Sequence, residues 1–134
     1  MNFDFVYKIC SKSEWLFAKQ KGQFIGTKKD IEDGYIHFSD KTQVERTLDK
    51  YFFKQKNLIL LKIETLKLDS LVWEQASDGN VFPHLYSIFN VSSVRNEYDI
   101  ILKICLLLLG NLLLTYLFHS PFPQLLSFHL TLHL

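Results

Sequence analysis

The stretch Leu58-Ile59-Leu60-Leu61-Lys62-Ile63 decides the fold that this sequence predicts. It is apolar on both faces of an extended chain, a pattern typical of a strand buried at the centre of a sheet. We therefore expect a domain built around this strand. The chain has 134 residues, which fits one domain and is long enough to bury a core without disulfides or metal ions.

Other short segments of the first 103 residues alternate apolar and polar positions or form apolar runs between turn signals. The segments read as strands or extended chain are Phe3–Ile9, Gln23–Ile25, Tyr35–Ser39, Leu71–Trp73, Leu85–Ile88 and Val91–Val94. The polar stretch Lys28–Gly34 is read as a loop, because it ends in an Asp-Gly turn signal.

Two helices are expected between these strands. The first is capped by Ser11 or Ser13 and ends at Lys21, before a glycine suited to the C′ position. The second runs from Lys41 to about Lys54, after an Asp-x-x-Gln capping box. Strands and helices mixed in this way predict an α+β domain.

Charge and cysteine content exclude several classes of protein. The formal net charge is only +1, and Arg46 and Arg95 are the two arginines, so we expect no nucleic-acid partner. The cysteines Cys10 and Cys105 have no metal-binding spacing and fit a reducing compartment. The first residues do not resemble a secretory signal, so the expected location is cytoplasmic.

The composition changes sharply after Lys103. Residues 104–134 contain no Asp, Glu, Lys or Arg. This tail is either an aberrant end produced by a frameshift or a read-through intron, a membrane anchor, or a core helix followed by a strand. Its apolar run is shorter than the roughly 20 residues of a spanning helix. We assign 1–103 to the domain and 104–134 to an aberrant apolar tail, with membrane association only if the tail is genuine.

Two histidine motifs are the candidates for a functional site. The first is Gly34-Tyr35-Ile36-His37-Phe38-Ser39, in which Tyr35, His37 and Ser39 share one face of an extended chain. An imidazole in an apolar strand must find a partner, because a buried polar group without one costs about 1–3 kcal/mol. The alternative is a purely structural role, in which His37 forms a hydrogen bond with a neighbouring carbonyl and Tyr35 packs in the core.

The second motif is Phe82-Pro83-His84-Leu85-Tyr86, preceded by Trp73-Glu74. His84 and Tyr86 again share a face, and Glu74 ends a strand, where its carboxylate can orient a hydroxyl. The alternative is a core Trp73 with a solvated Glu74. Together, the two motifs predict one shared His/Ser/Tyr-lined cleft.

Other reactive arrangements are absent from the sequence. The histidines lack the helical i, i+4 spacing of a zinc protease, so no metal site is expected. There is no nucleophile elbow of a hydrolase and no glycine-rich phosphate loop.

Taken together, these motifs resemble domain-of-unknown-function family 952 from about Val6 to about Ile101. The residues that carry the resemblance are Trp15 with Ala18, Gly34-Tyr35-Ile36-His37-Phe38-Ser39, Gln43, Leu60-Leu61-Lys62-Ile63, Trp73-Glu74, Gly79 and Phe82-Pro83-His84-Leu85-Tyr86. Ser87 departs from the glycine that the family typically has there.

The resemblance implies an ADP-ribosyltransferase-like fold, with small, mostly antiparallel half-sheets forming a cleft and two flanking helices. Within that group the local likeness is to RNA 2′-phosphotransferases, whose histidine–leucine–serine strand resembles His37-Phe38-Ser39. Their first-strand motif falls near Tyr7-Lys8-Ile9.

The resemblance further implies a small-molecule nucleotide ligand, NAD or a relative, and an NAD-dependent transferase that transfers or cleaves ADP-ribose. The catalytic candidates are His37, Glu74 and His84. The cofactor-binding candidates are Tyr35, Ser39, Tyr86 and Lys8. Neither arginine falls in a matching motif, which favours the alternative of a non-catalytic nucleotide or small-molecule binding module. A tail-anchored membrane protein is the second alternative.

Overall fold

The computed structural model describes residues 3–101 of the chain. Its helices are α1 (Lys12–Lys21), α2 (Lys28–Asp33) and α3 (Val44–Tyr51), with 3-10 turns η1 (Thr65–Lys67) and η2 (Val91–Ser93). Its strands are β1 (Phe5–Ser11), β2 (Gln23–Phe24), β3 (Ile36–His37), β4 (Leu58–Glu64), β5 (Leu71–Gln75), β6 (Val81–Leu85), β7 (Phe89–Asn90) and β8 (Val94–Ile100). Small antiparallel sheets with few helices confirm the predicted α+β class.

The largest strand pairings form the sheet β1-β4-β8, in which β4 is the central strand, as its sequence predicts. Side chains alternate between the two faces of this sheet, as the period of an extended chain requires. Ile59, Leu61 and Ile63 pack on one face, and Leu58 and Leu60 pack on the other.

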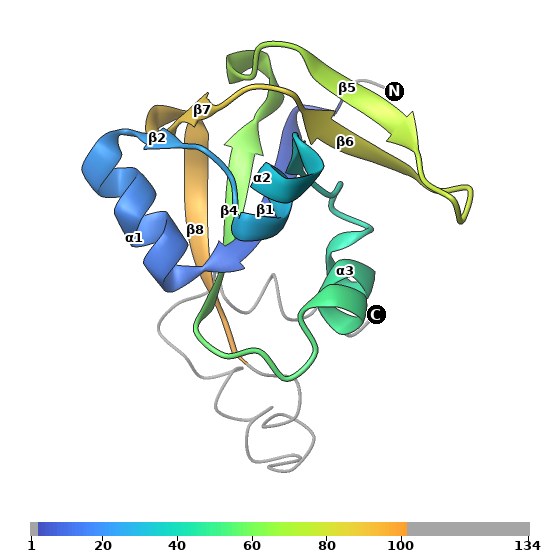
Figure 1. The fold of residues 1–134 in the computed structure, drawn as a ribbon, viewed down its shortest axis with the longest axis horizontal. Coiled ribbons are helices and arrows are strands. Elements are labelled where there is room, and N and C mark those ends of the chain that lie inside the picture. The colour runs from blue at the N-terminus through green and yellow to red at the C-terminus, as the bar shows by residue number, and fades with distance from the viewer. Residues whose placement is uncertain (1–2, 102–134) are drawn as a thin grey trace.

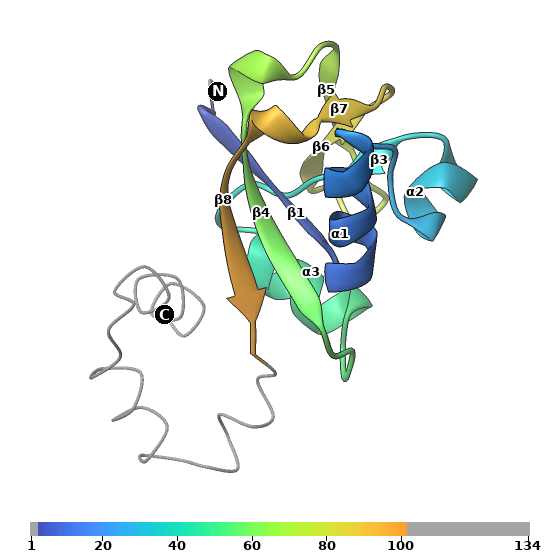
Figure 2. The same cartoon turned by 90° about the vertical axis from the view of Figure 1, so that its left-hand side faces the viewer.

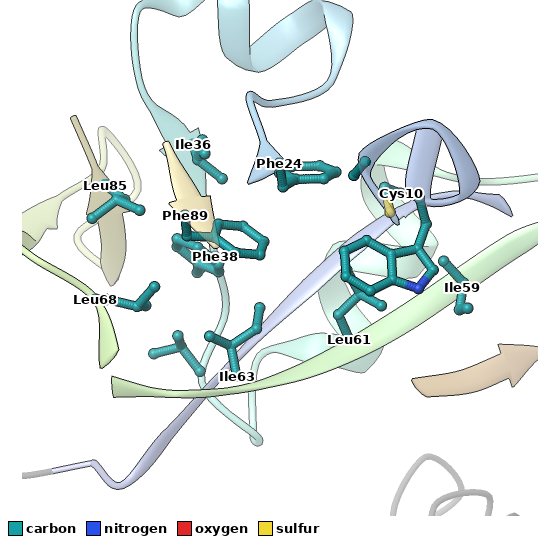
Figure 3. Close-up of a cluster of buried hydrophobic side chains, with 13 residues drawn as sticks. Cys10, Phe24, Ile36, Phe38, Ile59, Leu61, Ile63, Leu68, Leu85 and Phe89 are labelled. Atoms are coloured by element: carbon teal, nitrogen blue, oxygen red, sulfur yellow. The ribbon is translucent and has the colours of Figure 1, made fainter. Parts of the chain in front are cut away.

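The two faces are covered by different helices (Figure 2). Trp15 and Ala18 of α1 are buried in the larger cluster, and Val44 of α3 is buried in the smaller one. Figure 3 shows the larger cluster, in which Phe24 of β2 stacks on Phe89 of β7 at a centroid distance of 5.0 Å. This cluster therefore connects the central sheet to the remaining strands.

The second three-stranded sheet has the order β3-β6-β5 and lies at one end of the central sheet (Figure 1). Leu85 of β6 and Ile36 of β3 are register partners and are buried in the larger core cluster. After β3 the chain crosses to β1, where Ser39 and Tyr7 exchange two backbone hydrogen bonds. The sheet that carries both histidine motifs is thus attached directly to the core.

The caps of α1 and α3 contain the residues that the sequence indicates. The Ser11 side chain accepts from the Glu14 amide, and Gly22 adopts the left-handed conformation at the C-cap with φ 78°. Asp40 and Gln43 exchange the two hydrogen bonds of a capping box, but the regular helix begins only at Val44. The segment 41–43 forms turns instead, so α3 is shorter than predicted.

Three expectations are wrong in detail. The predicted strand Leu85–Ile88 keeps only its first residue, because β6 ends at Leu85 and β7 begins at Phe89. The predicted loop Lys28–Gly34 contains the helix α2, so the described chain has a third α-helix. The predicted strand Val91–Val94 is mostly the 3-10 turn η2, and the strand β8 begins only at Val94. The differences between these predictions and the structure are local. Polar side chains hide the sequence pattern of a short helix and of an exposed edge strand alike.

Within residues 3–101 no helix is long and apolar enough to cross a membrane. The tail assignment, 104–134, lies outside the described residues, and so does Cys105.

Candidate functional site

The two histidine motifs meet on the outer face of the β3-β6-β5 sheet. His37 and His84 are register partners in the antiparallel pair β3–β6. Their neighbours Ile36 and Leu85 point to the opposite face and are buried in the core. Because successive side chains of a strand alternate, burial of these apolar neighbours places both imidazoles outside the core.

Four rings form a compact group on this face, which we call the ring cluster: Tyr35, His37, His84 and Tyr86. Tyr35 lies in the middle, with centroid distances of 4.7 Å to His37, 4.4 Å to His84 and 5.2 Å to Tyr86. The centroids of His37 and His84 are 5.4 Å apart, and these two rings meet edge to face. Tyr86 is 55% exposed, so the cluster is open to solvent at this ring.

Glu74 of β5 holds one side of the ring cluster. Its Oε2 lies 2.7 Å from Nδ1 of His84 and 2.8 Å from the hydroxyl of Tyr86, which also donates to Oε1 at 3.0 Å. The hydrogen bonds from His84 and then Tyr86 lower the pKa of Glu74 below its usual value. An ionised carboxylate only accepts, so Nδ1 of His84 is the donor and its Nε2 is free of this contact.

Asp30 and Asp33 of α2 hold the other side. Oδ1 of Asp30 lies 2.7 Å from Nδ1 of His37, and Oδ2 of Asp33 lies 3.0 Å from Nε2 of the same ring. Asp33 is also paired with Lys29 at 2.7 Å, and the Lys29 hydrogen bond is the main cause that lowers the pKa of Asp33. One imidazole is therefore held between two carboxylates of a single short helix.

Asp30 reaches His37 from inside the protein. Asp30 is 1% exposed, and its Oδ2 lies 2.6 Å from Nζ of Lys8, which is itself buried. Nζ of Lys8 also donates to the carbonyl oxygen of His37 at 3.0 Å. The ammonium on β1 and the imidazole on β3 are thus joined through one carboxylate.

The charge states of this buried pair follow from burial and from the hydrogen bonds. Burial alone would raise the pKa of Asp30, but the hydrogen bond from His37 and the charge of Lys8 outweigh it, so the pKa lies well below its usual range. Burial lowers the pKa of Lys8, and its interaction with Asp30 offsets part of this effect. The side chain of Asp30 is therefore an ionised carboxylate, which only accepts hydrogen bonds.

The structure brings together five of the residues predicted for the site: Tyr35, His37, Glu74, His84 and Tyr86. The expectation that both histidine motifs face one site is confirmed by the contact between their rings. These side chains come from one sheet and from the residues next to its strands, with α2 beside it, rather than from two half-sheets facing across a cleft. Their catalytic and cofactor-binding roles stay predictions.

Two predicted cofactor-binding residues lie elsewhere. Ser39 is buried, and its hydroxyl lies 3.0 Å from that of Thr47 on α3. The Ser39 side chain does not share the face of His37, because Ser39 pairs with Tyr7 of β1 and not with β6. Lys8 is 4% exposed and its ammonium is occupied by Asp30 and a carbonyl, so it supports His37 from below instead of facing a ligand.

Asp30 and Asp33 are site residues that the sequence interpretation missed. A signal for Asp30 was present, because Thr27-x-x-Asp30 is the spacing of a capping box. The structure has both of its reciprocal bonds: Thr27 Oγ1 accepts from the Asp30 amide at 3.2 Å, and Asp30 Oδ2 accepts from the Thr27 amide at 2.8 Å.

No group of three or more histidine, cysteine, aspartate or glutamate side chains within residues 3–101 is arranged to hold a metal ion. A shallow hollow of about 490 Å³ lies apart from the ring cluster, on α3 and the turn before it. It is lined by Thr42, Glu45, Arg46, Asp49 and Lys50.

Comparison with known proteins adds a family and a solved relative. The family described as "Protein of unknown function (DUF952)" matches residues 9–97. The crystal structure of protein CC0527 from Caulobacter crescentus is 43% identical, with a TM-score of 0.71 over 74% of this chain and 88% of that one. The solution NMR structure of CC0527 is 43% identical, with a TM-score of 0.65 over 72% and 84%. Among curated proteins, no significant match was found.

Proposed function

The chain belongs to the DUF952 family of proteins of unknown function, and we propose that its ring cluster binds NAD or a related nucleotide. The observation that carries the proposal is Tyr35 packed between two carboxylate-bound imidazoles, beside the exposed ring of Tyr86. Flat π-faces favour a flat heteroaromatic ligand, and a cationic pyridinium ring adds attraction to the rings. The nicotinamide of NAD has both properties.

The oriented imidazoles suit the ribose next to that base. Nδ1 of His84 is bound to Glu74, so its Nε2 can contact a ribose hydroxyl. His37 presents a second imidazole 5.4 Å away between ring centroids. In this proposal Tyr35 or Tyr86 stacks on the base, and His84 binds one ribose hydroxyl. His37 binds another where that hydroxyl replaces Asp33 at its Nε2.

Lys29 is the cation best placed for a phosphate of the ligand. It is exposed on α2 and paired with Asp33, which itself contacts His37. Lys8 cannot serve in this way, because its ammonium is buried against Asp30. We therefore assign phosphate contact to Lys29 instead of Lys8.

The reaction that we propose is transfer or hydrolysis of ADP-ribose. The bond between C1′ of the ribose and the nicotinamide nitrogen breaks, and its electron pair leaves with nicotinamide. The ionised Glu74 stabilises the positive charge that develops at C1′. A water or hydroxyl acceptor then bonds to C1′ and gives its proton to an imidazole, for which His84 is our candidate.

A non-catalytic binding module is the second candidate. Both arginines are in ion pairs away from the ring cluster, Arg46 with Asp78 at 2.9 Å and Arg95 with Glu64 at 3.6 Å. Since guanidinium groups are the preferred partners of phosphates, their placement favours a ligand held mainly by its base and ribose. Such a site can bind without cleaving.

Binding is tested by calorimetry of the full chain with NAD, ADP-ribose and nicotinamide mononucleotide. We expect Tyr86→Ala to weaken binding about 2–10-fold, the equivalent of one lost aromatic contact. Arg46→Ala is the matched control, because it removes an exposed side chain of α3 that lies apart from the ring cluster. No heat, and no rise in thermal stability at millimolar concentrations of any of the three, would rule out the proposed ligand class.

Catalysis is tested by measuring nicotinamide release from bound NAD. We expect Glu74→Gln to keep the shape of the site but to slow release about 100-fold or more, because it removes the charge that faces C1′. Binding without nicotinamide release by the unmodified protein would favour the module over the enzyme.

A further inference from the structure

We infer that Asp30 is the positioning residue of His37: it fixes the orientation of the imidazole and keeps a proton on Nδ1, so that the ring presents Nε2 to Asp33 at the partly exposed side. This inference goes beyond the proposed function and does not depend on the identity of the ligand.

Every acceptor position of the Asp30 carboxylate is used. Oδ1 accepts from the amide of His37 at 3.0 Å and from its Nδ1 at 2.7 Å. Oδ2 accepts from the amide of Thr27 at 2.8 Å and lies 2.6 Å from Nζ of Lys8. These four donors match the about four lone-pair positions of a carboxylate.

These donors come from three separate parts of the fold. Lys8 belongs to β1, Thr27 precedes α2 and His37 ends β3. Rotation of the carboxylate would break several hydrogen bonds in a region that water does not reach. The close approach of Gly26 adds a steric limit, since a Cβ on this residue would lie 2.8 Å from Cβ of Asp30. The carboxylate is therefore held in one orientation.

The contacts of Asp30 also place a proton on Nδ1 of His37. A carboxylate that receives three other donors can face Nδ1 only as an acceptor, so the imidazole must carry a proton on that nitrogen. The second nitrogen, Nε2, points to the partly exposed side, where Oδ2 of Asp33 lies 3.0 Å away, and it too can face this carboxylate only as a donor. A ligand oxygen that enters the site would compete with Asp33 for this nitrogen.

The energetics of the buried pair also favour a positioning role for Asp30. A buried ion pair such as Lys8–Asp30 rarely stabilises a fold more than apolar residues of the same volume, because desolvation of both charges offsets their attraction. Stability alone therefore does not account for this pair beneath His37, whereas orientation of the ring does. The contrast with His84 supports this, since its partner Glu74 has a 38% exposed side chain, against 1% for Asp30.

The test is the imidazole ¹H–¹⁵N NMR spectrum of the full chain, with the His37 signals identified by their loss in His37→Gln. We expect a slowly exchanging proton on Nδ1 of His37. In Asp30→Asn the new amide can turn its NH₂ toward the ring, so Nδ1 should lose its proton, Nε2 alone should carry one, and the Nδ1 signal should disappear. The matched control is Asp33→Asn, the same change at the other nitrogen, which should leave the Nδ1 signal in place.

A further variant separates positioning from stability. Lys8→Met removes a donor from Oδ2 but leaves both His37 contacts on Oδ1, so the protein should become less stable while the Nδ1 proton remains. If the unmodified protein carries its His37 proton on Nε2 alone, the inference is wrong, whether or not the variants fold. It is also wrong if Asp30→Asn keeps the Nδ1 signal. Loss of NAD binding in calorimetry would leave this result unchanged, so the two proposals fail independently.

Discussion

At the scale of single residues, the site contains two imidazoles that each contact a carboxylate, one carboxylate buried and the other partly exposed. Each Nδ1 lies 2.7 Å from a carboxylate oxygen, of Asp30 for His37 and of Glu74 for His84. Asp30 is shielded from water, and Glu74 faces it. The first pair is suited to fixed geometry, whereas the second can exchange its partners with a ligand.

The buried carboxylate predicts a dependence of stability on pH. The pKa of Asp30 in the folded protein lies well below its usual range, so its stabilising effect is complete above the unfolded value of about 3.9 and is lost as the pH falls below it. Near neutral pH, Asp30→Asn should cost about 3–5 kcal/mol, because it leaves Lys8 without its counter-charge.

Urea unfolding of the protein and of Asp30→Asn between pH 3 and pH 7 checks this expectation. All other carboxylates are common to both proteins, so the difference in free energy of unfolding isolates Asp30. That difference should shrink below about pH 4. A difference that stays constant over the whole range would contradict the assigned direction of the pKa shift.

At the scale of elements, the short helix α2 supplies the two carboxylates that hold His37 of β3. It has six residues, too few to be stable by propensity alone, and its N-terminus is held by the reciprocal bonds of Thr27 and Asp30. Gly34 ends it in the left-handed conformation with φ 84°, so that the chain turns back directly into Tyr35 and β3. The acidic N3 residue of the capping box and the partner of the imidazole are therefore the same residue, Asp30.

Two glycines offer a matched test of how closely α2 is fitted. Gly22 and Gly26 both have positive φ, but only Gly26 faces Asp30, where a Cβ would lie 2.8 Å from its Cβ. We expect Gly22→Ala to cost about 1–2 kcal/mol for the left-handed conformation alone. Gly26→Ala should cost more and should shift the His37 imidazole signals, because Asp30 must move.

Thermal unfolding and the imidazole NMR spectrum of both variants provide the measurements. Equal losses of stability, with the His37 signals unchanged in Gly26→Ala, would mean that α2 accommodates the methyl group without displacing Asp30.

At the scale of the whole molecule, one sheet supplies the core and a second sheet supplies the site. The β1-β4-β8 sheet packs apolar side chains on both faces, while the β3-β6-β5 sheet has one core face and one face with the ring cluster. Lys8 connects them: its neighbours Val6 and Cys10 on the same face of β1 are core residues, and its ammonium ends at Asp30. The site is thus anchored to the rigid part of the fold.

Truncation tests whether the domain depends on the apolar tail. A chain that ends at Lys103 keeps every contact of β8 with β4 described above, so we expect the same unfolding midpoint and better solubility. A chain that ends at Ser93 is the control, because it lacks β8 and should not fold. Unfolding of the chain that ends at Lys103 would show that the tail contributes to the core.

The sequence by itself determined the elements whose signal is local. Leu58–Ile63 is apolar on both faces and became the central strand, because only a strand covered on both sides can bury such a pattern. Alternation likewise predicted that His84 and Tyr86 share a face. It failed for His37 and Ser39, because the two residues belong to different pairings even though they are two positions apart.

Tertiary structure alone decided how the site is supported. Lys8 and Asp30 are 22 positions apart in the sequence, and nothing local indicates that one charge will be buried against the other. The register of β3 with β6 brings His37 beside His84, and the return of the chain from α2 brings Asp30 beneath His37. Such contacts depend on how separate elements pack, because the energy of burying a charge is set by all of its neighbours together and not by its own segment.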